Sequence, residues 1–180
     1  VLDGVVDFLP SPVDLVEIKG FDPKTNLEVS RKPNDQEPFS SLAFKLAIDP
    51  FVGTLVYIRV YSGTLKRGDV VLNTRTNESF KIGRLVIMHA NQREEVEELF
   101  AGDIGAIVGI KDLKTGDTIC SPKAPIILES IKFADPVIWM KIEPKTKQDQ
   151  EKMGVYLKAL SDEDPTFKIK VDPETGDTLI

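Results

Sequence analysis

The chain has 180 residues, 41% of them hydrophobic, which suits one medium-sized domain or two small ones with a buried core. A formal net charge of −6 argues against a domain that grips nucleic acid through bulk positive charge. The single cysteine, Cys120, cannot form an internal disulfide, which fits a reducing compartment.

The sequence shows no membrane or export signal. No apolar run approaches the length needed to span a membrane. The first residues include Asp3 and Asp7, where a secretory signal would have a basic start. Because the chain also lacks an initiator methionine, we expect it to be a fragment of a longer protein.

The first 38 residues are expected to lead into the main domain. Apolar residues at helical spacing predict a short helix over residues 1–9, ended by Pro10-Ser11-Pro12. This helix reads either as a frayed terminus or as the partner of an absent upstream domain. Residues 19–38 are polar and interrupted by proline and asparagine, which predicts a linker with a short edge strand over residues 27–31.

Residues 39–122 read as an all-β barrel. Every apolar segment in this range is short and bounded by turn residues, which is typical of barrels. Val56, Ile58 and Val60 alternate with their neighbours at a period of two, which predicts a strand with one buried face. The nearly continuous apolar run 104–110 predicts a strand that is buried on both sides.

Residues 123–180 read as a second domain of the α+β type. The pattern predicts a strand over residues 137–142, a helix whose start is marked by the capping pair Thr146 and Asp149, and a strand over residues 167–171. A turn then begins a return strand. This β-α-β-β order is most of a ferredoxin-like fold, so we expect an incomplete domain and the less stable half of the chain.

No catalytic, cofactor or metal site is predicted from the residues themselves. The sequence contains no G-x-x-x-x-G-K-[ST] loop that could cradle phosphates. His89 is the only histidine, so neither a Ser-His-Asp triad nor a histidine metal cluster can form. The four glutamates between residues 94 and 98 read as a solvated acidic loop. We therefore expect that this fragment is not an enzyme.

Basic residues concentrate in the middle of the predicted barrel. Between Arg59 and Arg84, six positive residues stand against two negative ones, a local excess within an acidic chain. Composition alone favours ordinary solubility charge on the ends of hairpins. The six residues are Arg59, Lys66, Arg67, Arg75, Lys81 and Arg84.

Several long segments carry a resemblance to a known family. Residues 49–73 read DPFVGTLVYIRVYSGTLKRGDVVLN, a strand, a glycine turn and a second strand. The other segments are FSSLAFKLAIDPFVG (39–53), IGRLVIMHANQREEV (82–96), AGDIGAIVGIKDLKTGDTIC (101–120), ILESIKFADPVIWMKIEPKTKQDQEKM (127–153) and DEDPTFKIKVDPETGDTLI (162–180). In order and spacing they closely resemble the translational GTPases, and elongation factor G in particular, over essentially the whole chain.

The resemblance implies a domain organisation. The opening LDGVVDFLPSPVD resembles the end of that family's GTPase domain, so residues 1–18 are expected to be its C-terminal remnant. After the linker 19–38, residues 39–122 correspond to the β-barrel domain II and residues 123–180 to a truncated, ferredoxin-like domain III.

The resemblance also implies a function for the parent protein. Elongation factor G uses GTP to drive tRNA and mRNA through the ribosome, and GTP and Mg²⁺ would be held by the missing GTPase domain, so no cofactor is expected here. Alternatives are a ribosome-recycling, release-factor or tetracycline-resistance ribosomal-protection paralogue, or a structural adaptor barrel with no GTPase. The implied partners are small-subunit rRNA and ribosomal proteins, together with the parent's own GTPase and distal domains. The implied form is a monomer without membrane contact, in the bacterial cytoplasm or, alternatively, in a plastid or the mitochondrial matrix.

Finally, the resemblance assigns roles to surface residues. Because the family's second domain abuts small-subunit rRNA, the six basic residues become candidate phosphate contacts, with Arg59, Lys66 and Arg67 as the first choices. The loop 49–53 reads either as a turn with Phe51 tucked into the barrel or as a loop that faces the GTPase domain. The candidate interdomain contacts are Asp49, Pro50, Phe51, His89 and Arg93.

Overall fold

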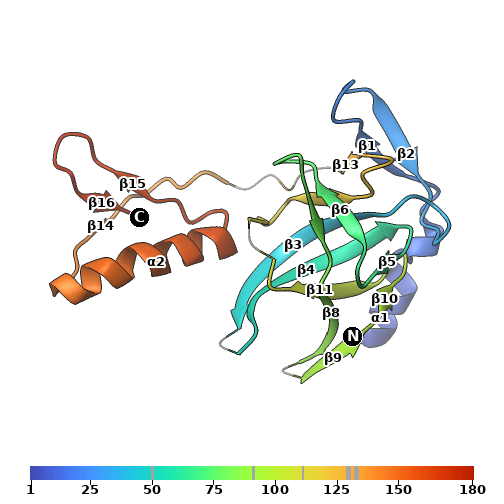
Figure 1. Cartoon of the computed structure of the whole chain (residues 1–180), viewed down its shortest axis with the longest axis horizontal. Coiled ribbons are helices and arrows are strands. Elements are labelled where there is room, and N and C mark those ends of the chain that lie inside the picture. Colours follow the sequence, from blue (N-terminus) through green and yellow to red (C-terminus); the bar gives the residue numbers. More distant parts are fainter. Residues whose placement is uncertain (50, 91, 111, 129–130, 132–133) are drawn as a thin grey trace. The chain divides into compact units, whose positions relative to one another are not determined.

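A computed structural model describes residues 1–49, 51–90, 92–110, 112–128, 131 and 134–180, except for the side chain of Val13. The chain forms two compact units, Val1–Ser130 and Ile131–Ile180 (Figure 1). The predicted domain boundary between residues 122 and 123 therefore differs from the division in the structure. Each unit is described by itself.

The first unit is a β-barrel-like domain built around one antiparallel sheet. Its strand order is β7-β6-β12-β3-β4-β11-β8-β9, and β5 and β10 form a separate two-stranded sheet. The strands of the large sheet are β3 (Ser40–Asp49), β4 (Gly53–Ser62), β6 (Val70–Asn73), β7 (Glu78–Lys81), β8 (Arg84–His89), β9 (Gln92–Val96), β11 (Ile104–Val108) and β12 (Thr118–Cys120). The short pair is β5 (Leu65–Lys66) and β10 (Glu98–Leu99).

The hairpin β3–β4 forms the spine of this unit. Val56, Ile58 and Val60 of β4 are fully buried, as their period-two spacing predicts. Strand β11 lies between β4 and β8, and its residues from Gly105 to Val108 are buried, whereas Ile104 is exposed. The predicted doubly covered strand is therefore confirmed for the part of the run that lies inside the sheet.

A small second sheet within the first unit includes part of the segment that was predicted to be a linker. Strands β1 (Ile18–Phe21), β2 (Glu28–Arg31) and β13 (Ile127–Leu128) form a sheet in the order β13-β1-β2. Gly20 fits tightly beneath β13, because a Cβ there would lie 2.5 Å from the carbonyl oxygen of Ile127. The segment 19–38 thus contains two paired strands, whereas the sequence predicted a linker with one edge strand. The pairing of β1 with β13 spans about a hundred residues and leaves no mark on the local sequence pattern, whereas β1 and β2 form a local hairpin that the sequence analysis missed.

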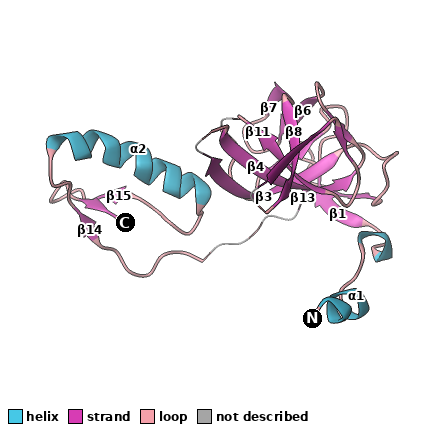
Figure 2. Cartoon of the chain, turned by 90° about the horizontal axis from the view of Figure 1, so that it is seen from below, coloured by secondary structure: helices cyan, strands magenta, loops and turns pink. Residues whose placement is uncertain are grey.

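The N-terminal helix forms as predicted but buries nothing. Helix α1 (Leu2–Phe8) is followed by the short 3₁₀ helix η1 (Pro12–Asp14), which leads into β1 (Figure 2). None of the α1 side chains is buried, so its apolar residues lie at the surface of the first unit.

The second unit has the predicted β-α-β-β order. Strand β14 (Lys141–Ile142) precedes helix α2 (Lys147–Glu163), and strands β15 (Lys170–Val171) and β16 (Thr178–Leu179) follow it (Figure 1). The sheet order is β14-β16-β15. The last strand lies antiparallel between the first two, which is the split βαβ arrangement. Both predicted strands are longer in the sequence pattern than in the sheet.

Helix α2 begins and ends where the sequence indicates. The hydroxyl of Thr146 accepts a hydrogen bond from the backbone N–H of Asp149 at 3.2 Å, which confirms the capping pair. The helix ends at Glu163, and its C-cap Asp164 precedes a proline. Leu157 is buried on this helix. In the described part of the chain, no helix combines the length and the apolar character that crossing a membrane requires.

Candidate functional site

Three of the six predicted basic residues lie beside acidic residues of one segment. Strand β5 pairs with β10 so that Lys66 stands directly opposite Glu98. Arg67, the next residue, donates its backbone N–H to the carbonyl oxygen of Glu97 at 2.9 Å. Arg84 begins β8, which pairs with β9. Pairing in two different sheets therefore brings these three basic residues close to the acidic segment 95–98.

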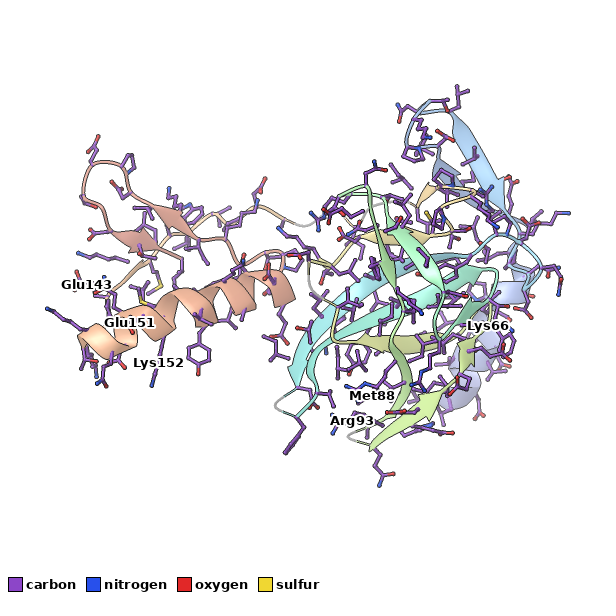
Figure 3. All side chains as sticks on the ribbon, viewed as in Figure 1. Lys66, Met88, Arg93, Glu143, Glu151 and Lys152 are labelled. Atoms are coloured by element: carbon purple, nitrogen blue, oxygen red, sulfur yellow. The ribbon has the colours of Figure 1, made fainter. Side chains whose placement is uncertain are left out.

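The side chains of these residues form ion pairs. Lys66 Nζ lies 2.8 Å from Glu98 Oε2, and the hydrogen bond that the ammonium group donates to this carboxylate raises the pKa of Lys66. Arg67 Nη1 lies 3.4 Å from Glu97 Oε1. Arg84 Nη1 lies 3.8 Å from Glu95 Oε1. We call these three pairs the ion-pair ladder. Figure 3 shows Lys66 where it projects from β5 beside β10.

All three pairs of the ladder are exposed to solvent. The exposed fraction of the paired side chains lies between 38% for Glu98 and 80% for Glu97. Exposed ion pairs contribute only about 0 to 1 kcal/mol, because water and salt screen the charges. The ion pairs of the ladder therefore orient the three basic side chains only weakly, and each pair can open at a low cost in free energy.

An open groove lies next to the ladder. It has a volume of about 490 Å³ and is lined by Arg67, Gly68, Lys81, Ile82, Gly83 and Glu97. The N–H of Gly68 donates to the carbonyl of Ile82 at 2.8 Å, which holds the two walls together. Within the described part of the chain, Lys81 forms no ion pair. The groove therefore presents one paired and one unpaired cation to solvent.

Arg75 is held differently from the ladder residues. Its Nε donates to Asp117 Oδ1 at 2.7 Å and its Nη2 to Asp117 Oδ2 at 3.0 Å. Its Nη2 also donates to the backbone oxygen of Asp112 at 2.8 Å. The carboxylate is 5% exposed, and it also accepts from Asn73 Nδ2 and from the N–H of Lys114, both at 3.0 Å. Arg75 therefore closes a buried polar network of the barrel.

Arg59 lies on β4 and takes part in neither group. Its guanidinium carbon lies 5.5 Å from the centre of the Tyr61 ring, which is within the range of a cation–π contact. The six basic residues therefore have different surroundings, which their spacing in the sequence does not reveal. Lys66, Arg67 and Arg84 form the ladder, Lys81 lines the groove, Arg59 contacts an aromatic ring and Arg75 belongs to a buried polar network.

The predicted interdomain residues come together from two hairpins. Asp49, at the end of β3, accepts hydrogen bonds from the N–H groups of Phe51 and Val52, and these bonds lower the pKa of its carboxyl group. Arg93 Nη1 lies 2.9 Å from Asp49 Oδ1 and ties the β3–β4 turn to the β8–β9 hairpin. Figure 3 labels Arg93 and Met88 in the latter hairpin. Pro50 lies outside the described residues.

Two further residues of this set lie at the surface. Phe51 is 85% exposed, so the interpretation that it is tucked into the barrel is wrong. The backbone of the tight turn is held by Asp49 and directs this side chain outward. His89 Nε2 lies 3.1 Å from Glu94 Oε2 on the exposed side of the β8–β9 hairpin.

The sequence analysis missed the partners of the basic residues. It treated the glutamates between residues 94 and 98 as a solvated loop, whereas Glu94 and Glu95 lie on β9 and Glu98 lies on β10. A polar edge strand has no apolar alternation, so its sequence gives no strand signal. Asp117 was likewise missed, because its partner Arg75 is 42 residues away.

Comparison with known proteins identifies both units. The family model for elongation factor Tu domain 2 matches residues 53–120, and that for elongation factor G domain III matches residues 133–180. Together they match more than half of the chain. The chain belongs to the elongation factor G-like translational GTPases. The two matches follow each other in the order that the sequence resemblance predicts.

A solved structure supports this family assignment over nearly the whole chain. A crystal structure of a protein from Thermus thermophilus matches with a TM-score of 0.75 and 26% sequence identity. The match covers 99% of this chain and 24% of that protein. The chain thus spans about a quarter of the length of this relative from the solved structures.

Proposed function

We propose that this chain is the central mechanical segment of a ribosomal translocase, elongation factor G. The observation that carries the proposal is the presence of an elongation factor Tu domain 2 followed by an elongation factor G domain III in one chain. In this proposal the barrel docks on the small ribosomal subunit. The second unit passes the state of the parent's GTPase domain to its distal domains.

In the proposed mechanism this segment positions the parent and performs no chemistry itself. GTP and Mg²⁺ bind in the GTPase domain of the parent, which is a ribosome-stimulated GTPase of the bacterial cytoplasm. The ladder cations, Lys81 and Arg59 contact phosphates of rRNA, which fix orientation without reading bases. The exposed position of the ladder cations and of Lys81 on a barrel with a buried core supports this role, whereas Arg59 is half-buried. Arg75 is the exception, since it stabilises the barrel from within.

The test is a toeprint of purified ribosomes supplied with the full-length parent and GTP. We expect the mRNA to advance by one codon. GTP hydrolysis without this advance would reject the translocase and favour a ribosome-recycling, release-factor or ribosomal-protection paralogue. Absence of both signals would reject the proposed function and leave only the family and the fold.

A second measurement examines the docking surface. Charge reversal of Lys66 and Arg67 in the parent is expected to weaken ribosome binding in a pelleting assay, more strongly at low salt than at high salt. Charge reversal of Lys152 on α2 serves as the control, because this lysine lies in the second unit (Figure 3). Equal effects of both changes would show that the ladder side of the barrel is not the docking surface.

A further inference from the structure

The three ladder cations proposed to contact phosphates already pair with carboxylates of the same chain. Each cation of the ion-pair ladder faces a glutamate from the short segment 95–98, at 2.8 to 3.8 Å. These glutamates come from β9, from β10 and from the residue between them. A carboxylate and a phosphate oxygen make the same kind of charge-assisted hydrogen bond with lysine and arginine. The two groups therefore compete for the same donors.

We propose that Glu95, Glu97 and Glu98 are internal counterions that an RNA backbone must displace when it binds the barrel. This inference rests on the proposed function, and it adds a selectivity device to the proposed docking surface. The side chains of these glutamates pair with the cations in the free protein and turn to solvent when phosphates replace them, while the strands that carry them stay paired.

The geometry supports exchange for the ladder and opposes it for Arg75. Two of the three ladder pairs, at 3.4 and 3.8 Å, are longer than the 2.7–2.9 Å of a strong ionic hydrogen bond. All three are exposed, so water can replace each contact while the partner moves. Arg75 instead binds the 5% exposed Asp117 through two nitrogens, and breaking that pair would leave a buried charge alone.

The groove provides the place where exchange begins. Arg67 and Glu97 form one side of it, and Lys81 lines it without an ion pair among the described residues. Nothing lies within 4 Å of the position that a Cβ of Gly83 would occupy, so a ligand can approach the backbone there. A first phosphate on Lys81 is therefore placed next to Glu97, repels it and frees Arg67 for the following phosphate.

This arrangement favours polymers over single anions. A single phosphate ion replaces only one carboxylate, so its binding free energy is small. An RNA strand brings several phosphates in a row and displaces several carboxylates at once, so its gain grows with the number of ladder cations that it reaches. The acidic segment should therefore suppress binding to stray anions more than binding to a fitted RNA backbone.

The experiment compares two triple variants of the 180-residue chain that carry the same net charge. The ladder triple is Glu95→Gln, Glu97→Gln and Glu98→Gln. The control triple is Glu17→Gln, Glu151→Gln and Glu174→Gln, at exposed glutamates away from the ladder. The probe is a fluorescein-labelled RNA hairpin of about 20 nucleotides, and its anisotropy is measured at about 50 mM and about 200 mM KCl. Circular dichroism verifies that each variant is folded.

We expect the ladder triple to bind RNA about tenfold more tightly than the wild type, and the control triple to change the affinity by less than about threefold. Adding Lys66→Ala and Arg67→Ala to the ladder triple should remove the gain. Equal affinities of the two triples, or no measurable binding by the ladder triple, would overturn the inference.

The outcomes also separate this inference from the proposed function. If Lys66→Ala and Arg67→Ala weaken RNA binding by the wild type while the ladder triple matches the control, the phosphate contacts stand and the counterion role fails. A toeprint signal from the parent is independent of both results. If the parent advances the mRNA but the ladder triple does not change RNA affinity, the proposed function stands and the counterion role of the glutamates is rejected.

Discussion

Asp117 is the residue whose removal tests the architecture of the barrel most directly. Its carboxylate is 5% exposed and accepts hydrogen bonds from Arg75, from Asn73 and from the backbone N–H of Lys114. These donors come from two stretches of chain about 40 residues apart. We predict that Asp117→Ala destabilises the first unit by breaking the connection between them.

The magnitude follows from what the substitution leaves behind. Asn73 is 2% exposed, so its amide loses an acceptor that water cannot easily replace, and the N–H of Lys114 loses its partner as well. Each buried donor left unsatisfied costs about 1 to 3 kcal/mol. Arg75 is 42% exposed and keeps its bond to the backbone of Asp112, so it turns to solvent at little cost. The free energy of unfolding should fall by about 2 to 6 kcal/mol.

The assay is urea unfolding followed by far-ultraviolet circular dichroism. Trp139 is the only tryptophan of the chain and lies in the second unit, so its fluorescence reports that unit separately. Glu95→Ala is the control, because it removes a carboxylate from an exposed pair at 3.8 Å and should cost less than about 1 kcal/mol. The reasoning is refuted if Asp117→Ala and Glu95→Ala shift the barrel transition equally, or if only the Trp139 signal moves.

Three further predictions concern turns and caps. Gly63→Ala should lower the unfolding free energy at least about twice as much as Gly53→Ala. Both glycines have positive φ, but a Cβ at Gly63 would lie 2.5 Å from the carbonyl oxygen of Glu37, whereas Gly53 has open space; equal urea midpoints would contradict this. Thr146→Ala should destabilise the second unit by about 1 kcal/mol through loss of the helix cap, seen in Trp139 fluorescence, and Thr146→Ser should restore most of it. Backbone N–H bonds lower the pKa of Asp172, so its stabilising effect is complete above the unfolded-state pKa of about 3.9 and is lost as the pH falls through the lower folded-state value. An NMR titration midpoint of Asp172 at or above about 3.9 would disprove this.

Local sequence favours two similar turns of the fold, of which the sequence analysis predicted only the second. Asp22-Pro23 and Asp172-Pro173 begin the same turn in the two units, and each aspartate accepts from the N–H groups two and three residues later. The fifth residue has a positive φ in both, as Asn26 and Gly176. Asparagine and glycine tolerate this conformation better than other residues, so the local pattern favours a turn at both places.

Periodicity and caps were determined in the same way. The buried face of β4 follows from alternation, and the start of α2 follows from Thr146 and Asp149. The family resemblance, which the two domain matches confirm, added the order of the units. Apart from the family resemblance, each of these sequence signals lies within a few residues of the strand, helix or turn that it predicts.

Only the tertiary structure decided which distant segments meet. The pairing of β1 with β13 converts a predicted linker into part of a sheet, although both partners are short. The same holds for Lys66 with Glu98 and for Arg75 with Asp117, which separate an exchangeable surface pair from a buried one. The sequence around a basic residue does not indicate whether its acidic partner is buried or exposed. The difference arises from desolvation, which depends on all the residues packed around the pair and so exists only in the folded protein.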